Sequence, residues 1–140
     1  MSFAETIGIL MDIFFDNPND PPVPPEEIAI RWLEVKPYED GRRVAIDFEI
    51  TPFQKRPNLE IDVRNQEGRL VSTFSVVEAI ENKMSFTLHL REESPGGEYL
   101  LTMEVFYTDL SSLEGEEGTI GDILIENKDI VANSQVTFSV

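Results

Sequence analysis

The chain has 140 residues, a formal net charge of −16 from 27 Asp and Glu against 11 Lys and Arg, and no cysteine. Such a surface repels phosphate backbones, which argues against nucleic-acid binding, and the lack of cysteine excludes disulfides, thiolate metal sites and thiol nucleophiles. A hydrophobic share of 41% is close to the globular average, so one domain with an ordinary core is predicted rather than global disorder.

An apolar arm is predicted at residues 1–16. The helical interpretation rests on apolar residues spaced along one helix face, and on Ser2 and Glu5, which are spaced as a capping box. A strand is the competing interpretation, because apolar residues also alternate from position 7 to position 13. Exposed apolar side chains invite a partner, so the arm is predicted to dock on its own domain or on a neighbouring copy, with an unrelated partner third. The predicted interaction residues are Phe3, Ile7, Leu10, Phe14 and Phe15.

The arm differs from a targeting or membrane segment. It lacks a basic start, and it carries Glu5 and Asp12 within its apolar stretch. It also falls short of the roughly 18–20 apolar residues that a membrane-spanning helix needs. We therefore expect no membrane insertion and a cytoplasmic location.

Residues 17–27 read NPNDPPVPPEE and are predicted to form a proline-rich linker. Five prolines in these eleven residues remove hydrogen-bond donors and hold the backbone near polyproline II. The segment also contains an overlapping PxxP pattern, but no adjacent Arg or Lys supplies the charged anchor of an SH3-type ligand. A stiff spacer is therefore the preferred interpretation.

Residues 28–140 are predicted to form an all-β domain of seven or eight antiparallel strands. Apolar and polar side chains alternate in four stretches, 44–50, 84–90, 99–107 and 136–140, so each sheet has one buried and one wetted face. In the first strand, Trp32 and Leu33 are adjacent and apolar, which predicts a bulge, and Pro37 is expected to end the strand or mark an edge. A short extra strand is expected near 123–125.

Two segments carry a family resemblance. SPGGEYLLTMEVFY at 94–107 resembles the E-to-F corner and F strand of immunoglobulin-like and fibronectin III-like modules, which implies that Tyr99 is the tyrosine-corner residue. LEIDVRNQEGRLVSTFSV at 59–76 is similar to the C and C′ strands of bacterial and macroglobulin-like members. The resemblance implies an immunoglobulin-like antiparallel sandwich but no function. The sequence departs from antibody-type domains because it has no cysteine pair and places Trp32 on the first strand.

Side chains suited to catalysis are scattered. His89 is the one histidine and lies on an outward strand face with no assignable partner, so a solvated surface role is preferred. Asp47 and Glu49, like Glu60 and Asp62, are two residues apart on outward faces, where carboxylates stay ordinary and solvated. We therefore predict a protein that is not an enzyme, with no catalytic residue and no cofactor.

An acidic segment within 109–122 is the one candidate for a cation site. Ca²⁺ takes six to eight hard oxygen ligands, but the segment does not match the EF-hand loop pattern. A solvated loop is the preferred interpretation, and the calcium candidates under the alternative are Asp109, Glu114, Glu116, Glu117 and Asp122.

Aromatic side chains away from the predicted core offer a second kind of surface. Exposed rings can stack on sugars, although packing at the core or an edge is the preferred role for each of Trp32, Tyr38, Phe53 and Phe106. Taken together, the sequence predicts a non-catalytic protein-binding or assembly module, with self-association through the arm as one form of it. A carbohydrate-binding accessory domain or a carboxylate-based hydrolase is the alternative.

Overall fold

The computed structural model describes residues 20–108 and 128–140, so the predicted arm at 1–16 and the acidic segment at 109–122 lie outside the described residues. The described part forms one short 3₁₀ helix, η1, and seven strands. In chain order these are η1 (Pro25–Glu27), β1 (Ile30–Pro37), β2 (Arg43–Ile50), β3 (Asn58–Arg64), β4 (Leu70–Val76), β5 (Lys83–His89), β6 (Glu98–Thr108) and β7 (Lys128–Ser139). No helix in residues 20–108 and 128–140 has the length and apolar composition needed to cross a membrane.

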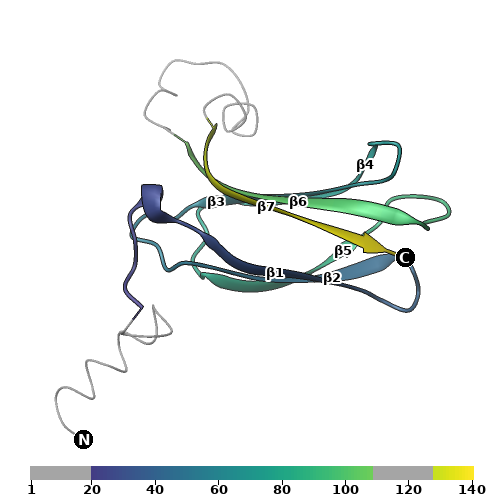
Figure 1. Cartoon of the computed structure of the whole chain (residues 1–140), viewed down its shortest axis with the longest axis horizontal. Coiled ribbons are helices and arrows are strands. Elements are labelled where there is room, and N and C mark those ends of the chain that lie inside the picture. The colour runs from purple at the N-terminus through teal and green to yellow at the C-terminus, as the bar shows by residue number, and fades with distance from the viewer. Residues whose placement is uncertain (1–19, 109–127) are drawn as a thin grey trace, which may run out of the picture.

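The strands form two antiparallel sheets that face each other across the core (Figure 1). One sheet has three strands in the order β1-β2-β5, and the other has four in the order β4-β3-β6-β7. The first and last strands, β1 and β7, lie side by side where the two sheets meet. This arrangement confirms the predicted antiparallel sandwich of seven or eight strands. Seven strands lie in the described residues, and the extra strand expected near 123–125 lies outside them.

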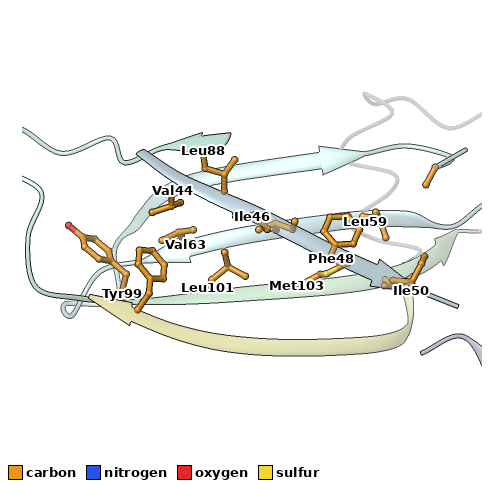
Figure 2. Packing of buried hydrophobic residues seen from close by; sticks show 14 of the residues in the cluster. Val44, Ile46, Phe48, Ile50, Leu59, Val63, Leu88, Tyr99, Leu101 and Met103 are labelled. Carbon is orange, nitrogen blue, oxygen red and sulfur yellow. The ribbon is translucent and has the colours of Figure 1, made fainter. Parts of the chain in front are cut away.

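The alternating stretches supply the core, as their period of two predicts. The apolar positions of β2 are fully buried, and they pack against the inward residues of the opposite sheet, as Figure 2 shows for Leu59, Val63, Leu101 and Met103. The polar positions of the same strands face outward and are partly exposed. Burial of this apolar surface is the main force that holds the two sheets together.

Irregularities in the ladders occur where the apolar pattern breaks. In the β1–β2 pair the register shifts between Ile30 and Trp32, which confirms the predicted bulge. Pro37 is the last residue of β1, an edge strand, where its missing N–H costs no ladder bond. A second shift lies in the β3–β4 pair between Val63 and Arg64, and a third in the β6–β7 pair.

The described part of the proline-rich segment contacts the sandwich. Val23 forms an isolated parallel bridge with Phe53, in which the Val23 N–H donates to the Pro52 carbonyl at 2.9 Å. Arg31 of β1 donates to a carboxylate oxygen of Asp20 at 2.6 Å. Where the linker ends and the domain begins stays a prediction.

Candidate functional site

A tyrosine ties together one end of the sandwich. The Tyr99 ring is buried at the start of β6 and stacks on Phe138 of β7 with 5.4 Å between ring centroids. Its hydroxyl accepts a hydrogen bond from the Gly96 N–H at 2.9 Å and donates to Glu92 Oε1 at 2.7 Å. A bond to backbone a few residues upstream is the contact expected of a tyrosine corner, so these atoms serve to fix the β5–β6 loop.

Glu92 lies beside Tyr99 in a shallow depression of about 720 Å³. The hydrogen bond from Tyr99 lowers the pKa of the Glu92 carboxyl, and the contacts with Asn65 and Arg69 lower it further. A carboxylate that is held ionised in this way is a poor general acid at neutral pH. The depression is lined by Arg69, Leu90, Arg91, Glu92, Glu93 and Ser94.

The one histidine, His89, lies next to a positively charged side chain. It is the exposed last residue of β5 and lies opposite Arg43 in the β2–β5 ladder, so its cross-strand neighbour is a cation. Among residues 20–108 and 128–140, no three His, Cys, Asp or Glu side chains are grouped so as to hold a metal ion. The calcium candidates lie outside these ranges and stay a prediction.

Trp32 lies near the start of β1 and Tyr38 directly follows its last residue, and contacts across the β1-β2-β5 sheet place both on its outer face. Each is 39% exposed. The Lys83 ammonium lies 6.0 Å from the Trp32 ring centroid, and the Arg43 guanidinium carbon lies 4.5 Å from that of Tyr38. The Tyr38 hydroxyl also lies 3.3 Å from Thr87 Oγ1 of β5. The structure therefore brings two of the four candidate aromatic residues onto one face.

Phe106 lies on the outer face of the other sheet, away from the main core, yet it is buried. The Lys128 ammonium covers it at 4.7 Å from the ring centroid. The same ammonium donates to Glu60 Oε2 at 2.8 Å and to Glu104 Oε1 at 2.7 Å. Partial burial acts to lower the pKa of Lys128, but the bonds to Glu104 and Glu60 outweigh it and the pKa is raised. Phe106 therefore has the packing role that the sequence favoured, whereas its contact with Lys128 depends on the pairing of β6 and β7.

The β4 edge is a surface that the sequence reasoning missed. Residues 70–77 read LVSTFSVV and carry no charge, in a chain of which 27% of residues are charged. Three large apolar side chains flank or end this edge, namely Leu70, Val77 and Ile80, which are 44%, 53% and 68% exposed. The uncharged run was a visible signal, but its position at a sheet edge depends on the topology.

The described residues form an antiparallel β-sandwich with exposed apolar and aromatic side chains on its edges and outer faces. No protein-family model and no curated protein matches the chain. Among solved structures it resembles Bifidobacterium dentium β-glucuronidase complexed with coumarin-3-O-glucuronide, with a TM-score of 0.51 and 14% identity. The match covers 81% of this chain and 18% of that enzyme, so the chain spans about a fifth of the enzyme's length.

Two other solved structures show weaker likenesses. Ruminococcus gnavus β-glucuronidase in complex with D-glucuronic acid has a TM-score of 0.44 and 14% identity, over 81% of this chain and 16% of that one. A glycosyl hydrolase family 2 member from Bacteroides cellulosilyticus has a TM-score of 0.49 and 7% identity, over 81% and 15%. The likeness to the Bifidobacterium enzyme is one of fold alone.

Proposed function

We propose that this chain is a non-catalytic binding and assembly module of the immunoglobulin-like or fibronectin III-like type. Support for the type comes from the strand order, three strands facing four, and from the hydrogen bond between Tyr99 and Gly96. Support for a non-catalytic role comes from the carboxylates and the histidine described above. Glu92 is held by Tyr99, and Glu60 by Lys128.

The observation that carries this function is the uncharged β4 edge. Edge strands expose backbone N–H and C=O groups that can pair with another extended chain, and proteins commonly block them with charges or proline. Residues 70–77 have neither. The Arg91 N–H already donates to the Val71 carbonyl at 2.9 Å, so the open part of the edge lies after Val71. An extended protein segment can add to the four-stranded sheet there, with main-chain hydrogen bonds providing affinity.

The test is whether the β4 edge accepts a strand. The probe is a synthetic peptide of residues 70–77 with two lysines at each end for solubility, titrated into the full-length protein. Amide hydrogen exchange, followed residue by residue by NMR, should slow at β4 positions that face the open edge and stay unchanged in β2. A lysine-flanked peptide of scrambled order is the control. No selective slowing at β4 would contradict the proposal.

A carbohydrate-binding role is the second candidate, and the placement of Trp32 and Tyr38 on one face favours it. The two residues are about 20 Å apart along β1, at roughly 3.3 Å per residue. It ranks second because a cation already covers one face of each ring. Trp32 is the only tryptophan in the sequence, so titration with neutral oligosaccharides should change its fluorescence if the face binds them.

The hydrolase alternative has a direct test. The neighbouring structure is a glucuronidase of which this chain covers 18%, so any activity of the whole enzyme is a separate matter. We expect full-length protein to release no chromophore from a chromogenic β-D-glucuronide. Turnover that survives Glu92→Gln but is lost with Asp47→Asn or Glu49→Gln would instead identify an active carboxylate pair on β2.

A further inference from the structure

We propose that the segment added at the β4 edge is β4 of a second copy of this chain, paired antiparallel about a two-fold axis. The proposal rests on the function proposed above and names its partner. The two four-stranded sheets would then form one continuous eight-stranded sheet across the dimer. Four features of the described residues lead to this partner.

The first feature is the direction of the backbone groups. In the turn that joins β3 to β4, the Asn65 N–H donates to the Arg69 carbonyl at 3.0 Å. Bonded and non-bonded pairs alternate along an antiparallel ladder, so counting along β3 in steps of two from Asn65 makes Ile61 a bonded position. The register pairs Ile61 with Phe74. The alternation directs the amides of Thr73 and Ser75 away from β3, toward the open edge.

The second feature is the contrast with the other edges. The outer strand β1 carries Arg31, Glu34 and Lys36 and ends in a proline, and it also contains a bulge. The outer strand β5 begins with Lys83, and β7 lies beside β1. Charges, proline and bulges are the devices that prevent edge-to-edge pairing. Within residues 20–108 and 128–140, β4 is the edge strand that lacks charges and proline. Its pairing with β3 also has a register shift, and the Val71 carbonyl accepts a hydrogen bond from the Arg91 N–H at 2.9 Å, so the open part of this edge begins after Val71.

The third feature is charge. Two copies that each carry a net charge of −16 repel one another over most of their surfaces. The strip at 70–77 has no ionisable side chain, so two copies can approach there without placing like charges in contact.

The fourth feature is the placement of exposed apolar side chains. Leu70 lies at one end of β4, while Val77 and Ile80 lie at and beyond the other end. A two-fold axis through the middle of β4 brings the Leu70 end of each copy to the Val77 end of the other. The same apolar contact therefore forms twice, which is the self-complementarity that a closed dimer requires.

The experiment compares two Thr→Lys variants of the full chain. Thr73 lies on the outward side of β4, where its hydroxyl donates to Asp62 Oδ1 at 2.7 Å, so a lysine at this position keeps an acidic neighbour and the fold. Thr137 is an exposed β7 residue that receives the same added charge in the control. Sedimentation velocity over a concentration series gives the dimer dissociation constant for each protein.

We expect the wild type and Thr137→Lys to dimerise, with affinity that rises with salt, and Thr73→Lys to weaken the dimer at least tenfold. A second variant, Ser75→Pro, removes an amide that faces the edge without removing a bond to β3 and should weaken the dimer similarly. Circular dichroism verifies that each variant is folded.

Three results would overturn the proposal. One is a wild-type chain that stays monomeric at the highest soluble concentration, and another is equal dimerisation of Thr73→Lys and Thr137→Lys. The third is a dimer that dissociates with Leu10→Asp and Phe14→Asp but not with Thr73→Lys, because assembly would then run through the arm. In each case the peptide titration still decides separately whether β4 accepts a strand.

Discussion

Replacing Lys128 with methionine removes one positive charge from between two carboxylates and keeps most of the aliphatic stem. The carboxylates of Glu60 and Glu104 lie opposite each other in the β3–β6 ladder, so without the ammonium two like charges would face each other directly. The methionine thioether can still pack on the Phe106 ring. The substitution therefore isolates the electrostatic contribution of the cluster.

The magnitude follows from the bonds and their exposure. Lys128 makes two short bonds, and the side chains of Lys128, Glu104 and Glu60 are 17%, 24% and 27% exposed. A hydrogen bond to a charged group contributes about 1.5–3 kcal/mol and an exposed ion pair less than about 1, so partial screening leaves about 1 kcal/mol for each bond. We expect a loss of about 2 kcal/mol, and at roughly 3 °C per kcal/mol for a chain of this size the Tm should fall by about 6 °C.

The assay is thermal and urea unfolding of the wild type, Lys128→Met, Glu60→Gln with Glu104→Gln, and the triple variant. In the background that lacks both carboxylates, Lys128→Met should cost far less, and added salt should narrow the difference in the wild-type background. An equal loss in both backgrounds would refute the reasoning, because the lysine would then act through its contact with Phe106 rather than through charge.

Four further predictions concern two tyrosines, one glutamate and one glycine. Tyr99→Phe should lower stability by about 1 kcal/mol through loss of the bond from the Gly96 N–H, measured by urea unfolding. Folding lowers the pKa of the Glu92 carboxyl, so the stability that this carboxyl contributes is present above its ordinary pKa and should be lost as the pH falls through and below that pKa. Glu92→Gln should therefore flatten the acidic part of the profile of Tm against pH. Burial raises the pKa of Tyr107 from 10.0 to about 12, so stability is full below pH 10 and should be lost as the pH rises toward 12, and Tyr107→Phe should reduce that loss. Gly97→Ala should cost about 1 kcal/mol, because Gly97 has a φ of +88° and an added Cβ would lie 3.3 Å from Gln66 Oε1; an unchanged Tm would show that the loop adapts.

The regular strands could be predicted from the sequence because one face of each sheet is buried and the other is wet. The alternation from Val44 to Ile50 predicts this burial pattern directly, and the adjacent apolar residues Trp32 and Leu33 predicted the bulge. Phe106 illustrates the limit: parity correctly placed it off the core, but its burial depends on Lys128, which reaches it from a strand about twenty positions later. The β4 edge could not be located for a similar reason. Whether a strand is outermost is a property of the sheet order, which alternation does not encode.

The contact between β1 and β7 has a consequence for how the protein folds during synthesis. The two strands are separated by nearly the whole described chain, so the entropy of closing that long loop opposes their contact until other structure has formed. Non-local pairings of this kind make β-sandwiches slow to fold. While β7 is still within the ribosome, β6 has an unpaired side of its own, and the nascent chain must pass through an interval with two open edges on the same sheet.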